Sequence, residues 1–112
     1  MSDDIKFGDM RTEYGKSLVE LGEQDKNIVV LGADTTDSLK TADFGKKFPN
    51  RFFNVAIAEA NLVSVAAGLA YSGKTSFAST YPIFLPGRCV DQIRTAIAYP
   101  SRTDKTGLNV KL

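Results

Sequence analysis

The sequence contains no histidine and no tryptophan, and its 112 residues include a single cysteine, Cys89. Without histidine, the chain cannot build a serine–histidine–aspartate triad or a histidine-ligated metal site from its own residues. A lone cysteine cannot form an internal disulfide, which is typical of proteins from a reducing compartment. These absences exclude two common kinds of catalytic site within the chain and predict a cytoplasmic protein.

Net charge and long apolar runs are also scarce. The formal net charge is +1, from 14 Lys and Arg against 13 Asp and Glu. This balance disfavours charge-driven binding to nucleic acid or to a membrane surface. No apolar run reaches the roughly 18 residues that a membrane-spanning helix needs. With 43% hydrophobic residues, the chain can form a globular core. We expect a lead-in over residues 1–8 and one domain over residues 9–112.

Apolar runs alternate with helical patterns along the chain. The apolar face of the first predicted helix consists of Met10, Tyr14, Leu18 and Leu21. Asp9 is its predicted N-cap, Gly22 its predicted stop, and Gly15 a predicted point of close packing. Further helices are predicted over 41–48, 59–71 and 88–99, and strands over 28–31, 51–55, 75–80 and 108–112. A polar loop is expected over 101–107.

This alternation predicts the α/β class, with an open parallel sheet flanked by helices. The last predicted strand stops at its fifth residue, Leu112, so we expect an incomplete domain, truncated at its C-terminus. After the first strand the chain reads Gly32-Ala-Asp34 instead of G-x-G-x-x-G, and no G-x-x-x-x-G-K-[ST] occurs. The phosphate cradles of dinucleotide-binding and P-loop proteins are therefore missing.

Glu59 opens the helix predicted over 59–71, which is apolar on nearly every side and has no cation within three residues of Glu59. A helix of this kind is normally buried, and a buried acid is costly unless it is hydrogen-bonded or takes part in chemistry. Alternatively, the negative charge of Glu59 interacts favourably with the helix dipole, and its carboxylate caps free N–H groups of the first turn. The residues alone leave both interpretations open.

The loops after the strands carry the other candidate residues, because ligands of parallel α/β sheets bind beyond the carboxyl ends of the strands. These loops contain Ser38, Tyr81, Phe84 and Arg88 as well as Glu59. Together they suit a flat ligand with polar edges and an anionic tail. Alternatively, both aromatic residues belong to the core and Arg88 is solvated. A cation in a first helical turn opposes the dipole, which favours an anionic partner for Arg88.

Residues 52–70 read F-F-N-V-A-I-A-E-A-N-L-V-S-V-A-A-G-L-A. This segment resembles the pyrimidine-binding domain of the transketolase family, whose pattern there is close to R-F-x-N-x-x-I-A-E-x-N-M-V-x-x-A-x-G-x-A. Residues 10–18 and 28–38 resemble the family's first helix and its first strand and loop. Residues 77–94 resemble its S-T-F-x-x-F-x-x-R-x-x-D-Q-I-R segment. The order favours the C-terminal subunit of a split transketolase.

The resemblance implies an enzyme that uses thiamine diphosphate and a divalent metal to move a two-carbon ketol unit between sugar phosphates, as in the pentose phosphate pathway. The family's I-A-E glutamate corresponds to Glu59, and its carboxyl hydrogen-bonds N1′ of the aminopyrimidine ring. Phe84 corresponds to the phenylalanine that stacks on this ring. Tyr81 takes the other aromatic place in the same loop.

Arg11 and Ser38 correspond to positions that contact the sugar-phosphate substrate in the family, where an arginine fork suits a phosphate. Arg88 corresponds to the arginine of R-x-x-D-Q and is a weaker substrate-binding candidate. The chain has one residue more between Phe84 and Arg88 than many members, which blurs the register of Arg88. Ala60 stands where the family often has glutamine.

The family's G-D-G…N motif, which holds the diphosphate and its Mg²⁺ or Ca²⁺, is absent from this chain, as are the family's catalytic histidines. The resemblance therefore implies a homo- or hetero-oligomer with a diphosphate-binding N-terminal subunit or domain, and a chain that is inactive alone. Two alternatives are a related thiamine enzyme (deoxyxylulose-phosphate synthase or a 2-oxo-acid dehydrogenase β subunit) and a catalytically silent α/β interaction module. The D-T-x-x-S loop and R-x-x-D-Q-I-R favour transketolase, and the presence of Glu59 with Phe84 disfavours the silent module.

Overall fold

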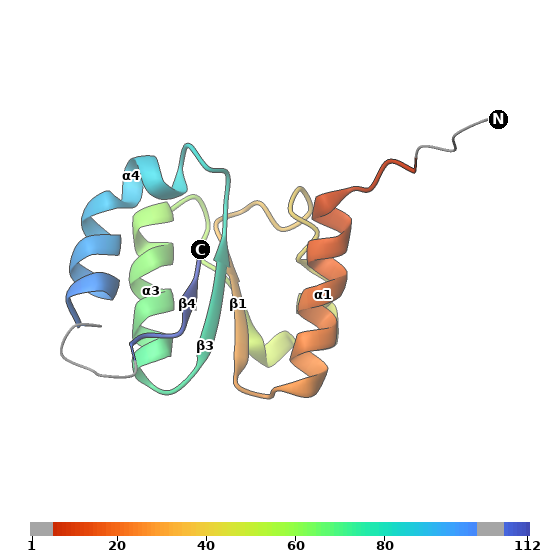
Figure 1. Cartoon of the computed structure of the whole chain (residues 1–112), viewed down its shortest axis with the longest axis horizontal. Coiled ribbons are helices and arrows are strands. Elements are labelled where there is room, and N and C mark those ends of the chain that lie inside the picture. The colour runs from red at the N-terminus through yellow and green to blue at the C-terminus, as the bar shows by residue number, and fades with distance from the viewer. Residues whose placement is uncertain (1–5, 101–106) are drawn as a thin grey trace.

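The computed structural model describes residues 6–100 and 107–112, and within them a four-stranded sheet forms the centre of the molecule (Figure 1). All the pairings are parallel, in the order β2-β1-β3-β4. The strands are β1 (Ile28–Gly32), β2 (Phe52–Asn54), β3 (Thr75–Ser79) and β4 (Val110–Lys111). The predicted open parallel sheet is confirmed. Most of the predicted lead-in and of the loop over 101–107 lies outside the described residues.

Helices cover both faces of the sheet. The helix α1 (Met10–Gln24) packs with α2 (Ala42–Lys47) on one face, and the 3₁₀ turn η1 (Pro49–Arg51) follows α2. The helix α3 (Glu59–Tyr71) packs on the other face with α4 (Leu85–Gln92), which continues into the π-helical turn η2 (Ile93–Ala98). Figure 1 shows these two layers on either side of the strands. No helix within the described ranges is long and apolar enough to cross a membrane.

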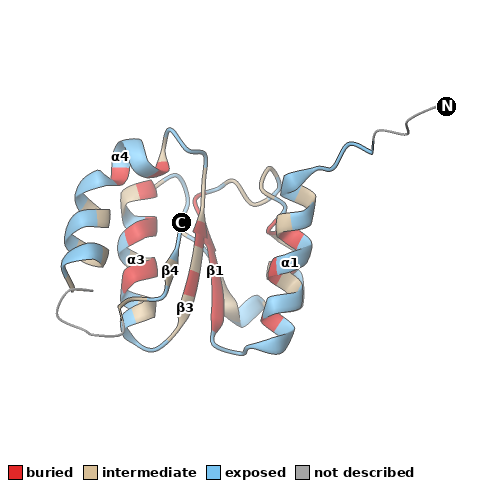
Figure 2. Cartoon of the chain, in the orientation of Figure 1, coloured by how far each residue is buried: buried red, intermediate tan, exposed pale blue. Residues whose placement is uncertain are grey.

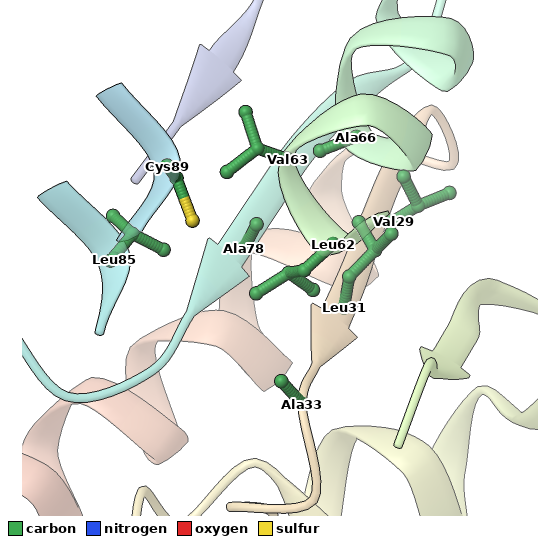
Figure 3. Close-up of a cluster of buried hydrophobic side chains, with 9 residues drawn as sticks. All are labelled: Val29, Leu31, Ala33, Leu62, Val63, Ala66, Ala78, Leu85 and Cys89. Atoms are coloured by element: carbon green, nitrogen blue, oxygen red, sulfur yellow. The ribbon is translucent and has the colours of Figure 1, made fainter. Parts of the chain in front are cut away.

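The strand β1 is buried along its whole length, as its unbroken apolar run predicted. Its side chains alternate between two hydrophobic clusters because successive strand residues point to opposite faces. Val29 and Leu31 face the cluster beneath α3 and α4, shown in Figure 3. Ile28 and Val30 face the cluster beneath α1 and α2. The sheet is therefore held from both sides.

The first helix begins as predicted and ends later. The carboxylate of Asp9 accepts a hydrogen bond from the Arg11 N–H, which confirms the N-cap. The helix continues to Gln24, so Gly22 is not its stop. A Cβ at Gly22 would lie 2.7 Å from the Phe44 ring, which shows that this glycine permits close helix packing instead.

The inward face of α1 also differs from the predicted one. Leu18 is buried, but Met10 is 86% exposed and Leu21 is also exposed. Gly15 and Gly22 lie inward in their place, because α1 approaches the α2 segment closely. Close packing at Gly15 is confirmed.

The fourth helix begins at Leu85, three residues before the predicted start at Arg88. Pro86 does not delay it, because a helix tolerates proline in its first turn. Val90 is 63% exposed, although its spacing from Ile93 and Ile97 is that of one helix face. Leu85 and Cys89 are buried instead, and η2 continues this face with two residues that pack on the core, Ile93 and Ile97.

The helix α3 has the predicted bounds but is not buried on all sides. Leu62, Val63, Ala66 and Ala67 face the core, whereas Asn61, Ser64 and Gly68 are exposed. Figure 2 shows buried and exposed surfaces alternating along α3. Composition predicted complete burial, but only one face of the helix meets the sheet.

Candidate functional site

The carboxyl ends of β1 and β3 lie at the same edge of the sheet as the starts of α1, α3 and α4 (Figure 1). Glu59 is the first residue of α3, and Phe84 is the N-cap residue of α4. The two residues therefore come to one edge of the parallel sheet, where ligands of such sheets bind. This edge is the candidate site.

Glu59 is a buried acid with a charged neighbour. Its side chain is only 9% exposed, and its Oε1 lies 3.7 Å from Nη1 of Arg88, whose side chain is 60% exposed. The contact is an ion pair that is too long for a hydrogen bond. Ala58 occupies the N-cap position and makes no side-chain capping hydrogen bond. The start of α3 favours the negative charge of Glu59 through the helix dipole, but Glu59 does not hold the N-cap position.

Two aromatic rings are linked to this acid through Arg88. The rings of Tyr81 and Phe84 meet edge to face, with their centroids 6.1 Å apart. Phe84 is half-buried and Tyr81 is exposed, and neither ring belongs to the two core clusters. The guanidinium carbon of Arg88 lies 4.5 Å from the centroid of the Phe84 ring. The structure thus brings Glu59, Phe84, Arg88 and Tyr81 together. The ion pair among them joins the first turn of α3 to α4.

Cys89 forms part of the wall behind the ion pair. It is fully buried, and its thiol lies 3.5 Å from the carbonyl oxygen of Phe84. Burial raises the pKa of the Cys89 thiol, the carboxylate of Glu59 raises it further, and the Arg88 cation lowers it. The thiol is therefore close enough to sense both charges of the pair. It is a small residue of the core.

Asn54 is a residue of this edge that the sequence did not single out. Its Oδ1 accepts hydrogen bonds from the N–H groups of Asp34 at 2.9 Å and Ala56 at 3.0 Å. Its Nδ2 donates to Oδ1 of Asp34 at 3.4 Å. Asp34 and Ala56 have φ angles of 62° and 61°, a strained region for residues other than glycine. Asn54 thus joins the loop after β1 to the loop that carries Glu59. Its position at a strand end was the available sequence signal.

Arg11 and Ser38 lie on the other side of the strand ends. Arg11 is exposed at the start of α1, where its Nε lies 3.5 Å from Oδ1 of Asp9. Ser38 is half-buried in the loop after β1. This loop borders a cavity of about 270 Å³ that is lined by Asp37, Lys40, Ala42 and Asp43. The structure therefore places Arg11 and Ser38 at the same edge as Glu59 but on the opposite face of the sheet.

The donor set suits part of a thiamine cofactor. A buried carboxylate beside a half-buried phenyl ring can bind a flat heteroaromatic ring that presents polar atoms at its edge. Across residues 6–100 and 107–112, no three acidic, cysteine or histidine side chains come together to hold a metal ion. These residues fit the pyrimidine end of thiamine diphosphate.

Residues 8–105 match the family model described as "Transketolase, pyrimidine binding domain". The chain is 48% identical over 103 residues to a provisionally named transketolase C-terminal section of Methanocaldococcus jannaschii, covering 92% of this chain and 31% of the relative. It is also 41% identical over 80 residues to 1-deoxy-D-xylulose-5-phosphate synthase of Clostridium acetobutylicum, covering 71% of this chain and 13% of the relative.

A solved structure of a split-gene transketolase, an inactive β4 tetramer, superposes with a TM-score of 0.75 at 54% sequence identity. The match covers 89% of this chain and 31% of that one. The chain thus spans less than a third of the length of each of these relatives.

Proposed function

Because the chain belongs to the family of transketolase pyrimidine-binding domains, we propose that it forms the pyrimidine side of a thiamine diphosphate site. In this role it takes part in the transfer of a two-carbon ketol unit between sugar phosphates. One observation carries the proposal: at the carboxyl edge of the sheet, the buried carboxylate of Glu59 and the Phe84 ring both contact the guanidinium of Arg88. Most structural acids are exposed, so a buried acid beside an aromatic platform favours a ligand site.

Each residue then has a defined task. The carboxyl of Glu59 holds a proton between its oxygen and N1′ of the pyrimidine ring. Phe84 offers its face to the ring, and Tyr81 closes the side of the site through its edge contact with Phe84. When bound, the cofactor supplies the carbon nucleophile that carries the ketol unit.

The remainder of the site comes from a partner in this proposal. A diphosphate-binding N-terminal subunit or domain holds Mg²⁺ or Ca²⁺ and supplies the histidines that this chain lacks. The split-gene relative supports this division, because it is inactive as a β4 tetramer. Arg11 and Ser38, at the same edge but on the opposite face of the sheet, are proposed contacts of the sugar phosphate. Arg88 is a weaker candidate for that role.

A second candidate function is that of a related thiamine enzyme, such as deoxyxylulose-phosphate synthase. The identity of 41% to such a synthase favours it. Both candidates give Glu59 and Phe84 the same tasks and differ in the acceptor. The two are distinguished by assaying each reaction with the same preparation.

The test of the proposed function is to combine the full chain with its partner subunit, thiamine diphosphate and Mg²⁺, and to measure ketol transfer from xylulose 5-phosphate to ribose 5-phosphate. Glu59→Gln should lower kcat about 100-fold or more, because it removes a proton-holding group. Glu13→Gln is the matched control, since Glu13 also lies in the first turn of a helix but is exposed and paired with Lys16. Retention of most of the activity by Glu59→Gln would show that the role of Glu59 is wrong.

A further inference from the structure

Arg88 makes both of the contacts that the proposed cofactor ring would use. Its guanidinium lies 3.7 Å from the Glu59 carboxylate and 4.5 Å from the centre of the Phe84 ring. A guanidinium is planar, carries N–H donors at its edge and stacks on aromatic faces. It therefore resembles an aminopyrimidine ring in the features that this site recognises. We propose that Arg88 competes with the pyrimidine ring for Glu59 and Phe84, and that it must withdraw before thiamine diphosphate binds. This inference rests on the proposed function.

The position of Arg88 allows this withdrawal. The residue lies in the first turn of α4, so its long side chain can move without unfolding the helix. Its side chain is 60% exposed, and its ion pair is longer than a hydrogen bond. A half-solvated ion pair and an exposed cation–π contact are each weak. A modest gain from ring binding is enough to displace the guanidinium into solvent.

The displacement also gives Arg88 a second use. The guanidinium leaves the carboxylate when the ring takes its place, and it is then unpaired at the mouth of the site. An unpaired arginine fork binds the phosphate or other anionic group of a substrate well. The order of events is thus cofactor first and anionic substrate second.

The test measures the affinity for thiamine diphosphate directly, by isothermal titration calorimetry of the full chain with its partner and Mg²⁺. Arg88→Gln removes the competitor and should lower Kd about tenfold, or about 1.4 kcal/mol. Arg88→Lys keeps the charge but loses the planar fork, and its Kd should fall between those of the wild type and Arg88→Gln. Arg94→Gln is the matched control, because Arg94 lies further along the same chain segment, pairs with Asp91 at 3.0 Å and lies over the ring of Tyr99. Its Kd should equal that of the wild type.

The outcomes separate the two proposals. An unchanged or weaker affinity in Arg88→Gln, with tight binding by the wild type, overturns the competition and leaves the proposed function standing. Absence of binding by the wild type overturns the proposed function itself. Thermal unfolding of each variant verifies the fold. Under saturating cofactor, Arg88→Gln should also raise the KM for the phosphorylated substrate, which a purely structural role would not change.

Discussion

The hydroxyl of Tyr14 on α1 lies 2.5 Å from the hydroxyl oxygen of Ser79 at the carboxyl end of β3. The contact joins a helix on one face of the sheet to the strand whose following loop leads to Tyr81 and Phe84. Burial raises the pKa of Tyr14, and the hydrogen bond to Ser79 opposes that rise only in part. The neutral phenol is thus the form that this position favours.

Tyr14→Phe should therefore change how stability depends on pH. The unfolded chain releases the phenol proton near pH 10 while the folded chain still holds it, so the contribution of Tyr14 is complete below pH 10 and is lost as pH rises through the higher folded pKa. The difference in the free energy of unfolding between wild type and Tyr14→Phe should be constant from pH 7 to 9 and fall above pH 10. Urea unfolding at several pH values measures it. A difference that stays constant up to pH 11 would contradict the raised pKa.

Gly15→Ala should destabilise the fold, although alanine is the better helix former. A Cβ at Gly15 would lie 2.3 Å from the carbonyl oxygen of Lys40, whose φ of 60° leaves its backbone little freedom to move. We expect a loss of about 1–3 kcal/mol, typical of overpacking. Gly68→Ala in α3 is the matched control, because no heavy atom beyond the neighbouring residues and the backbone of its own helix lies within 4 Å of the position of its Cβ. This control should gain about 0.5–1 kcal/mol. Urea unfolding measures the free energy of unfolding of both variants. Changes of the same sign in Gly15→Ala and Gly68→Ala would refute the prediction.

Asn54→Ala should loosen the two loops that meet beside Glu59. It removes the acceptor of the Asp34 and Ala56 N–H groups, and these residues hold positive φ angles. We expect a loss of about 1–3 kcal/mol in the free energy of unfolding and faster hydrogen exchange at both amides. Asn54→Asp keeps an oxygen acceptor but sets a second carboxylate beside Asp34, so it should protect the amides partly. If the Asp34 and Ala56 amides of Asn54→Ala exchange hydrogen as slowly as those of the wild type, the Asn54 side chain does not join the loops.

Cys89 offers an internal reporter of the Glu59–Arg88 pair. Its thiol pKa is raised by burial and by the Glu59 carboxylate, and Arg88 lowers it. Titration of thiolate absorbance should give a lower pKa in Glu59→Gln than in the wild type, and a higher one in Arg88→Gln. The raised pKa also means that the contribution of Cys89 to stability is complete below about pH 9, its unfolded value, and is lost above it. Shifts in the opposite directions would show that the two charges do not reach the thiol.

Local sequence patterns determined several parts of this protein. The apolar run of β1 predicted a strand buried on both faces, and Asp9 predicted the start of α1, because strand periodicity and capping depend on neighbouring residues. The helix over 59–71 and the parallel sheet were also predictable. The I-A-E-x-N segment indicated the family that the comparison with the family model shows.

Tertiary structure decided the rest. The facing residues of α1 and α4 depend on how closely each helix approaches its neighbours, so Gly22 became a packing contact and Val90 an exposed residue. Glu59 has no cation near it in sequence, and only the packing of α4 on α3 brings Arg88 to it. Asn54 likewise acquires its partners from the pairing of β2 with β1. The sequence by itself determined which elements form and which family they belong to, because these follow from short-range patterns. The charge pairing at the candidate site follows from contacts between distant segments, which only the packed sheet and helices specify.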